Sequence, residues 1–485
     1  MTKKQKKMRL RIIISLVLFV ILFVCEHMGV LEPLPWWAQL LIFAVPYLIV
    51  GYDIIFKAVR NISHGQIFDE NFLMMIATFG AFGVGEYLEA VAVMLFYQVG
   101  ELFQGYAVGK SRQSITEMMD ICPEYANVEE DGKLVTVDPD DVEVGTIIVV
   151  KPGERIQAAI AGEKPDKLPY SFWTHLPGID LNPELLAEKT YEFYKKYDID
   201  FIKTMNNGMY AIEDFGCEID YSDIAKGGVA KVTKTPIHEA KDWYELKPCS
   251  VKEGSLAREL KGLKLVLDKV KNEDVPVIFT IFSPLTTANK LSGNTLLQYL
   301  ENGDGDAVHH ALKVITETTC NMARAALEAG ADGIFFAAQS STYNFMTAEQ
   351  YKEFGVPYDL EVLNAAKDGW MNTLHAHGSN IMMEILKDYP VQVFNWHAWE
   401  TYPSVDEAAL ESGKCLMGGL NRTDITKDDR NAIHHQIYEC FKLMGGCGQI
   451  LTPGCVIRYP LNEETLKFIR KAKDDVEAKI HPIYA

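Results

Sequence analysis

Apolar residues follow two different patterns along this chain of 485 residues. Up to about residue 106 they form long runs, whereas beyond residue 157 short apolar segments alternate with amphipathic ones. Runs of about twenty apolar residues are typical of membrane-spanning helices, and the alternation is typical of parallel βα units. The pattern therefore predicts a membrane segment followed by a globular α/β domain.

The apolar runs predict four transmembrane helices within a membrane region of residues 1–118, with expected bounds of about 12–30, 36–56, 70–84 and 88–106. Lys and Arg residues precede the first run and follow the second and fourth, while the other two connections carry none. Positive residues favour the cytoplasmic side. We therefore expect a multi-pass protein of the inner (cytoplasmic) membrane, with its N-terminus and its C-terminal domain in the cytoplasm. A cleaved signal peptide is the alternative for the first run, but no small-residue cleavage site follows it.

A short β pattern occupies residues 119–156, where three apolar segments are separated by turn residues. Together with residues 69–74 and 85–94, the segment 144–156 resembles a heavy-metal-transporting P-type ATPase. The likeness covers the first four membrane helices of that family and the first strands of its actuator domain, so the resemblance implies a truncated actuator-like fragment.

Three motifs that such a pump requires are absent from the sequence: the Thr-Gly-Glu-Ser loop, the Asp-Lys-Thr-Gly-Thr phosphorylation site and the Cys-Pro-Cys ion-binding helix. Without an aspartyl-phosphate there is no energy coupling, so we expect no functional P-type ATPase. Glu86, Glu89 and Glu101 lie in or beside the predicted spans, where acidic groups can contact cations. They are interpreted as remnants of a pump's entry path.

The soluble part, residues 157–485, predicts a (β/α)8 TIM barrel. Its eight expected strands are residues 169–173, 201–205, 277–282, 333–338, 371–374, 391–396, 415–418 and 449–452. Residues 208–256 have little periodicity and are interpreted as a loop-rich insertion after the second strand. A doubly wound sheet is the alternative, but no Gly-x-Gly-x-x-Gly follows a strand.

Chemically active side chains gather where the predicted strands end, which is where TIM barrels place their sites. His375 and His377 are two positions apart on an extended segment and therefore point the same way. Cys455 follows the last strand, and its thiolate could complete a three-ligand metal site with one open position. The plain alternative is a hydrogen-bonded histidine pair beside an inert cysteine.

Other strand ends supply candidates for catalysis and substrate binding. The catalytic candidates are His397, Glu400 and His175; His397 or Glu400 is alternatively a fourth metal ligand. The candidates for substrate binding are Asn206, Asn207, Gln339, Trp399 and Asn421. Each has a structural alternative, since Trp399 could serve packing and Asn421 could cap the following helix.

Residues 157–480 resemble the uroporphyrinogen decarboxylase superfamily, which includes zinc-dependent methylcobamide:coenzyme M methyltransferases. The segments that carry the likeness are 182–185, 198–201, 329–333, 418–421 and 453–455. The decarboxylase branch has an arginine-rich loop after strand one, a Phe-Ser-Asp after strand two and a late Gly-His-Gly. Here the first loop has no arginine, the second has no acid, and Pro-Gly-Cys replaces the third.

The methyltransferase branch binds zinc through His-x-Cys and a later Cys, and His377 stands here where the first of those cysteines would be. This resemblance implies Zn²⁺ on His375, His377 and Cys455, and a corrinoid protein that delivers a methyl group to a thiol substrate. Uroporphyrinogen decarboxylation, as in porphyrin biosynthesis, is the runner-up; Lys203 and Arg458 are its only anion-binding substitutes. A degenerate, membrane-tethered binding protein is the third interpretation.

Composition narrows the choice of partners. A formal net charge of −19 argues against nucleic-acid binding, and nine scattered cysteines suit a reducing compartment better than a disulfide framework. A small-molecule substrate and the lipid bilayer remain the expected partners. Residues 153–156 fit both halves, which suggests a fusion, biological or from gene assembly, at this stretch.

Overall fold

A computed structural model describes residues 3–63, 70–100, 102, 126–130, 133–143, 145–224 and 230–484. The chain forms two compact units, residues 1–147 and 148–485. The division falls before the expected boundary at residue 156, because the stretch shared by the two halves folds with the second unit. Glu101 and the end of the fourth predicted span lie outside the described residues.

The N-terminal unit contains the helices α1 (Lys3–His27), α2 (Trp36–Ser63), α3 (Glu70–Val84) and a further helix at Tyr87–Gly100. Within the described part of the chain, two helical segments are long and apolar enough to cross a membrane, Met8–His27 and Trp36–Ala58. The described parts of the third and fourth predicted spans, Phe72–Val84 and Tyr87–Gly100, are helical but shorter than such a crossing requires, so a four-span topology stays a prediction.

Polar and apolar contacts both join these helices. Phe43, Tyr47 and Met94 are buried in their common core. Asp53 accepts hydrogen bonds from Arg11 at 2.8 Å and from Gln98 at 2.7 Å. Further along the chain, β1 (Ala126–Glu130) and β2 (Lys133–Val137) form an antiparallel hairpin, as predicted for the actuator-like fragment.

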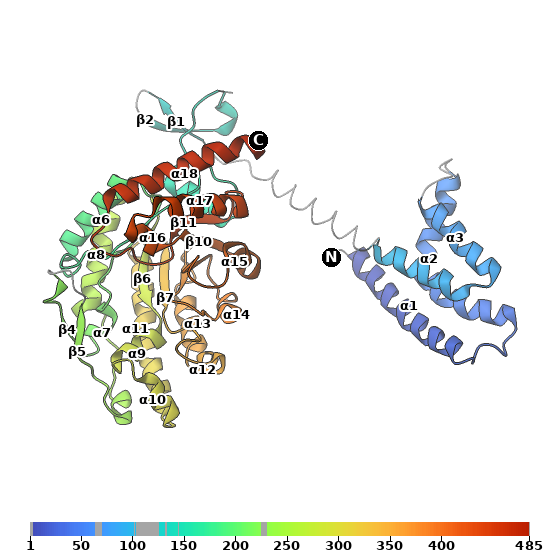
Figure 1. Cartoon of the computed structure of the whole chain (residues 1–485), viewed down its shortest axis with the longest axis horizontal. Coiled ribbons are helices and arrows are strands. Elements are labelled where there is room, and N and C mark those ends of the chain that lie inside the picture. Colours follow the sequence, from blue (N-terminus) through green and yellow to red (C-terminus); the bar gives the residue numbers. More distant parts are fainter. Residues whose placement is uncertain are drawn as a thin grey trace. The chain divides into compact units, whose positions relative to one another are not determined.

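The second unit is built on a seven-stranded parallel sheet in the order β11-β10-β9-β8-β7-β6-β3. The strands are β3 (Ile202–Lys203), β6 (Val277–Phe282), β7 (Gly333–Ala338), β8 (Thr373–Ala376), β9 (Val393–Trp396), β10 (Cys415–Leu420) and β11 (Gln449–Pro453). Their sequences are almost wholly apolar because both faces of a parallel sheet are covered. Figure 1 shows the strands in the middle of this unit, with helices around them.

The predicted first strand is an extended segment rather than a named strand, but it connects the two edges of the sheet. Ser171 N–H donates to the Leu451 carbonyl on β11 at 3.1 Å, and Leu451 N–H donates to Pro169 at 2.8 Å. On the other side, Asp200 N–H, next to β3, donates to the Tyr170 carbonyl at 2.9 Å. The result is a TIM-barrel-like arrangement of seven strands and one bridging segment.

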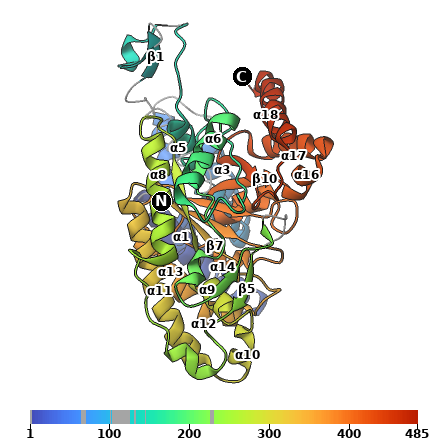
Figure 2. The ribbon, with the colours of Figure 1, turned by 90° about the vertical axis from the view of Figure 1, so that its left-hand side faces the viewer.

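Helices surround the sheet and fix the strand ends. They are α5 (Pro152–Ile160), α6 (Pro183–Tyr197), α7 (Tyr210–Glu213), α8 (Gly254–Val270), α9 (Pro284–Leu291), α10 (Leu296–Glu301), α11 (Gly305–Glu328), α12 (Ala348–Phe354), α13 (Val356–Ala365), α14 (Met383–Leu386), α15 (Val405–Ser412), α16 (Arg422–Lys427), α17 (Arg430–Met444) and α18 (Glu463–Tyr484). Figure 2 shows α11 and α13 side by side. The predicted insertion contains α7 and a small hairpin, β4 (Glu218–Asp220) and β5 (Lys231–Lys234).

Candidate metal centre

Two histidines stand at the carboxyl end of the central strand β8. His375 belongs to the strand, and His377 follows it directly. His375 is 3% exposed, because β7 and β9 flank its strand on both sides. The alternation of side chains along extended backbone brings both rings to one side, as the sequence predicts.

Four possible ligand atoms, from His375, His377, His397 and Cys455, lie within 4.8 Å of one another. The Nε2 of His375 is 3.2 Å from the Nδ1 of His377, which is 3.6 Å from the Sγ of Cys455. His397 follows β9 and Cys455 follows β11, so three strand ends build one cluster. The three predicted ligands therefore lie together, and His397, predicted to be catalytic or a fourth ligand, joins them.

A buried asparagine fixes the orientation of the His375 ring. The Nδ2 of Asn395 donates to the Met417 carbonyl at 2.6 Å, so its Oδ1 must face the Nδ1 of His375, 2.5 Å away. That oxygen can only accept, which assigns the ring proton to Nδ1. The Nε2 of His375 therefore points its lone pair into the cluster.

His397 has one engaged nitrogen and one orphaned nitrogen. Its Nδ1 lies 3.4 Å from the Oε2 of Glu400, whose Oε1 is 3.9 Å from the Nε of Arg422. Its Nε2 is buried without a hydrogen-bond partner among the described residues. A buried unpartnered nitrogen is costly, and a bound ion would satisfy it.

Burial sets the protonation states in this cluster. It lowers the pKa of His377 and of His397 to about 4, and it lowers the pKa of His375 well below the usual range. The three imidazoles are therefore neutral near pH 7, the form in which histidine binds metals. Burial raises the pKa of the Cys455 thiol, against the opposing charges of Arg422 and Lys203.

The cluster opens into a cavity of about 660 Å³. Its wall includes Trp173 and Phe335 together with the cationic side chains of Lys203, Lys290, Arg422 and Arg458. None of the described residues that line it is acidic. A cavity of this size accommodates a small-molecule substrate.

The structure places the other predicted site residues in two groups. His175, Asn206 and Gln339 line the cavity. Enclosure, with the charges of Lys203 and Lys290, lowers the pKa of His175. The Nδ2 of Asn206 donates to the buried Glu259 at 2.9 Å, which fixes its amide.

Asn207, Trp399 and Asn421 are not among the cavity-lining residues. Asn207 donates to Asp180 at 3.2 Å and accepts from the Met209 N–H at 2.8 Å. The Trp399 indole donates to the Gly419 carbonyl at 2.9 Å, and Asn421 caps α16 by accepting from the Thr423 N–H. These bonds are structural, so the capping alternative describes Asn421.

Two residues that matter at the site were not among the sequence candidates. Asn395 leaves a weak signal, since an amide inside the apolar strand β9 requires buried partners. Lys290 leaves none, because only the packing of α9 turns its ammonium toward the cavity. Glu400 was a candidate, but its pairing with Arg422 follows from tertiary structure.

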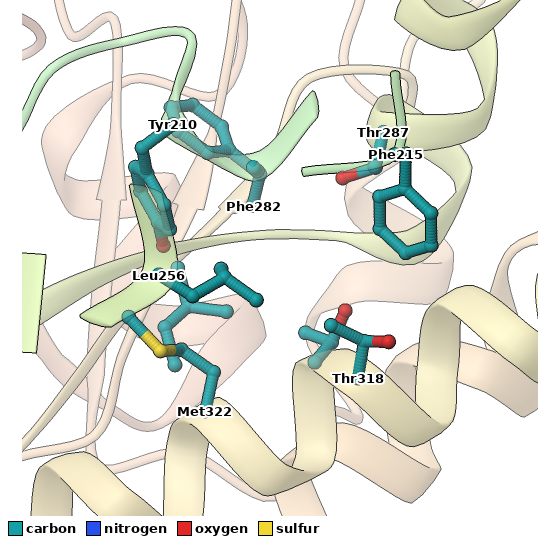
Figure 3. A pocket seen from close by; sticks show the side chains of 10 residues that line it. Tyr210, Phe215, Leu256, Phe282, Thr287, Thr318 and Met322 are labelled. Atoms are coloured by element: carbon teal, nitrogen blue, oxygen red, sulfur yellow. The ribbon is translucent and has the colours of Figure 1, made fainter. Parts of the chain in front are cut away.

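A second void is too small for a substrate. It has a volume of about 20 Å³ and lies among Tyr210, Leu256, Phe282 and Met322. Figure 3 shows the Phe282 ring beside Tyr210, with Met322 below them. The same phenylalanine also lines the large cavity, so its ring forms part of the wall between the two spaces.

Comparison with known proteins identifies relatives of each unit. The profile of the uroporphyrinogen decarboxylase (URO-D) family matches residues 151–475, and that of the P-type ATPase actuator domain matches residues 120–161. Among solved structures, a methyltransferase from Methanosarcina mazei aligns over its whole length with 68% of this chain, at a TM-score of 0.60 and 22% sequence identity. At that identity the likeness shows the fold.

The N-terminal unit resembles cation pumps. A cadmium, zinc and cobalt-transporting ATPase of Bacillus subtilis is 56% identical over 118 residues, which are 24% of this chain and 17% of the pump. A zinc-transporting ATPase of Synechocystis is 49% identical over 119 residues, 24% of this chain and 16% of the pump. The chain thus spans about a sixth of the length of these relatives.

Proposed function

The chain belongs to the uroporphyrinogen decarboxylase family, and we propose that its barrel unit is a zinc-dependent methyltransferase that methylates a thiol. The observation that carries this proposal is the convergence of four possible ligand atoms, three imidazole nitrogens and one thiol sulfur, within 4.8 Å at the edge of a large cavity. The fold shared with the Methanosarcina methyltransferase supports it. The corrinoid protein as methyl donor is an expectation from the family resemblance alone.

The ligand set suits zinc. Bonds of about 2.0–2.1 Å to nitrogen and about 2.3 Å to sulfur put neighbouring ligand atoms of a tetrahedral site about 3.3–3.6 Å apart. The separations from the Nδ1 of His377 to the Nε2 of His375 and to the Sγ of Cys455, 3.2 Å and 3.6 Å, match those edges. His375, His377 and Cys455 would hold the ion. When bound, zinc would lower the pKa of a thiol and so supply a nucleophile at neutral pH.

The chain's own residues prepare the site for this reaction. Asn395 holds the lone pair of His375 toward the cluster, and the charges of Lys203 and Arg422 favour the Cys455 thiolate. Methylation of the substrate would form a sulfur–carbon bond, leave the electron pair of the broken methyl bond on the donor and release the thiol proton. The neutral His175 in the cavity wall and Glu400 beside His397 are the bases that we propose to take it.

Decarboxylation of an anionic substrate without a cofactor is the second candidate. The observation that favours it is the cationic wall of the cavity, which suits a carboxylate. The histidine–cysteine cluster would then have no chemical role, although its imidazoles are buried, neutral and close together. For this reason the methyltransferase is the better-supported function.

For the N-terminal unit we propose membrane attachment. Two helices have the length and composition of membrane spans, and the sequence lacks the phosphorylation motif of a pump. On this proposal the ATPase-like segment anchors the barrel on the cytoplasmic side of the membrane and moves no ions.

Metal analysis of the purified full-length chain in detergent tests the function. We expect one tightly held zinc per chain, and at least a hundredfold weaker zinc binding in His377→Ala and in Cys455→Ala. The exposed His434→Ala and the half-buried Cys447→Ala serve as matched controls and should keep the metal. A metal-free protein that decarboxylates uroporphyrinogen would overturn the proposal in favour of the second candidate.

A further inference from the structure

Two basic segments of the sequence belong to the helices α1 and α2 of the N-terminal unit. The first, residues 3–11, has six Lys and Arg among its nine residues. The second, residues 57–60, contains Lys57 and Arg60 near the end of α2. Neither segment has a part in the chemistry proposed for the barrel unit.

α1 and α2 pack against each other in opposite directions (Figure 1). The Nη2 of Arg11 donates to Asp53 at 2.8 Å. Further along α1, the Ser15 hydroxyl donates to the Pro46 carbonyl at 2.6 Å, which is earlier on α2. The beginning of α1 therefore lies beside the end of α2, and the two basic segments meet at one end of the unit.

Helical spacing places basic residues on the faces that hold this contact. On α1, Lys3, Lys7 and Arg11 follow one another at intervals of four residues. On α2, Lys57 follows Asp53 at the same interval. Residues four apart share one face of a helix, and each interval advances about one turn. One turn beyond the Arg11–Asp53 pair, a basic position of α1 is therefore level with a basic position of α2.

Positive charge is in excess at this end of the unit. The two segments together contribute eight basic residues. Among the described residues of these helices, the acidic residues at the same end are Asp53 and Glu70, with which α3 begins. The candidate spans Met8–His27 and Trp36–Ala58 respectively begin and end here. Basic clusters in this position attract the headgroups of anionic lipids.

Arg11 has the surroundings of a residue at the boundary between lipid and water. Its guanidinium carbon lies 4.5 Å from the centre of the Tyr52 ring, and Tyr52 is 50% exposed. Tyrosine is enriched at this boundary of membrane proteins. The Nε and Nη1 of Arg11 have no hydrogen-bond partner among the described residues, so N–H donors remain for an anion.

We propose that the adjoining ends of α1 and α2 form one binding site for the headgroup of an anionic phospholipid, centred on Lys7, Arg11 and Lys57. The inference rests on the membrane attachment proposed for this unit and names the class of lipid that the attached protein selects. A phosphate group between the helices supplies acceptors to the guanidinium and offsets the excess of positive charge. A headgroup with two phosphates binds more tightly than a headgroup with one.

Native mass spectrometry of the full-length chain in detergent tests the inference with defined lipids. Tetraoleoyl cardiolipin and dioleoyl phosphatidylglycerol are compared with dioleoyl phosphatidylcholine, whose headgroup has a phosphate but no net charge. We expect the chain to bind the anionic lipids about tenfold or more tightly than phosphatidylcholine, and cardiolipin most tightly. An excess of inorganic phosphate should leave bound cardiolipin in place. Displacement by phosphate would show a site for the free ion and overturn the inference.

Single variants test whether the two segments form one site. One basic residue near an anionic membrane surface contributes about a fivefold change in affinity. Lys7→Gln and Lys57→Gln should each weaken cardiolipin binding by about this factor, although the two residues are distant in sequence. The double variant Lys264→Gln/Lys367→Gln removes two exposed lysines of the barrel unit and should bind as the parent does. Cardiolipin binding that is unchanged in Lys57→Gln would overturn the inference.

Two further measurements distinguish the reasons for a failure. Lys57→Arg keeps the charge and should bind cardiolipin as the parent does; weaker binding in this variant would show that Lys57 acts through the fold and would overturn the inference. If the full-length chain leaves the membrane fraction without detergent, membrane attachment itself is wrong and the lipid site is wrong with it. If the chain requires detergent but binds all three lipids equally, attachment stands and the inference alone is wrong.

Discussion

The two units of this protein stand in opposite relations to their relatives. The N-terminal unit is 56% identical to a cadmium, zinc and cobalt-transporting ATPase over 118 residues, yet it spans only 17% of that protein. The barrel unit is 22% identical to a methyltransferase, yet it aligns with that protein over its whole length. High sequence identity thus accompanies a small part of a relative. Low identity accompanies a whole fold in which four possible ligand atoms lie close together.

The comparison teaches that chemistry depends on the completeness of a site. A pump needs its ion path, its phosphorylated aspartate and its actuator loop at the same time, and the last two are absent from the sequence. A barrel site needs a few side chains at strand ends, and the ends of β8, β9 and β11 supply four possible ligand atoms here. Three experiments sharpen or break this contrast.

The largest effect is expected from the asparagine that orients His375. Asn395→Leu leaves the Nδ1 proton of His375 without an acceptor, whereas Asn395→Asp keeps an acceptor oxygen. Loss of such a supporting hydrogen bond weakens metal binding about 10- to 100-fold. We expect this for the leucine variant and undiminished zinc affinity for the aspartate variant, measured by competition with a chelator.

Both variants lose the donor to the Met417 carbonyl, so both should be less stable to a similar degree. Equal zinc affinity in the two variants would contradict the orienting role of Asn395. It would also weaken the case that the barrel unit holds the complete site.

A smaller effect is expected from a carboxyl group in the barrel core. Asp359 accepts hydrogen bonds from Tyr351 at 2.6 Å and Tyr389 at 2.8 Å, and burial raises its pKa to about 7. The folded state therefore holds this proton more tightly than the unfolded chain does. Stability from this group is present at low pH and is lost as the pH rises through the folded pKa. Between pH 6 and 8 the free energy of unfolding should fall by about 1.4 kcal/mol.

Asp359→Asn keeps an acceptor oxygen for both tyrosines and cannot ionise. Denaturant unfolding at pH 6, 7 and 8 should therefore show a flatter pH profile for this variant than for the parent. The exposed Asp368→Asn serves as the control and should keep the parent's slope. A parent profile without this decline would show that Asp359 ionises normally.

We expect no effect in the last experiment, which tests the N-terminal unit for pump activity and for zinc binding. Incubation with ATP and zinc should form no acid-stable phosphoenzyme, because the sequence has no phosphorylation motif. Glu86→Gln and Glu89→Gln should leave the zinc content of the protein unchanged. Formation of a phosphoenzyme, or a lower zinc content in either glutamine variant, would contradict this contrast between the two units.

Much of the fold could be predicted from the sequence, because hydrophobic periodicity reports secondary structure directly. Seven of the eight expected strands are present. The remaining one, the first predicted strand at residues 169–173, is an extended segment between β11 and β3. It forms only isolated bridges, Tyr170 with Leu451 and Thr174 with Ile457. Periodicity cannot reveal that difference, since the same apolar residues are buried in either case.

The stretch shared by the two halves shows what local sequence leaves open. Residues 151–161 match both family profiles. Tertiary contacts decide between them: residues 152–160 form α5, Ile156 is fully buried in the barrel core, and Arg155 pairs with Asp166 at 2.7 Å. The conformation of this short segment is therefore set by the core against which its apolar face packs.

The sequence by itself determined the alternation of strands and helices, the apolar runs near the N-terminus and the pair His375 and His377 on one side of a strand. These features depend on neighbours along the chain. Tertiary structure alone decided that His397 joins the cluster, that Asn395 orients His375 and that Lys290 faces the same cavity as Lys203. Their partners are distant in sequence, and only the packing of the helices around the sheet brings them together.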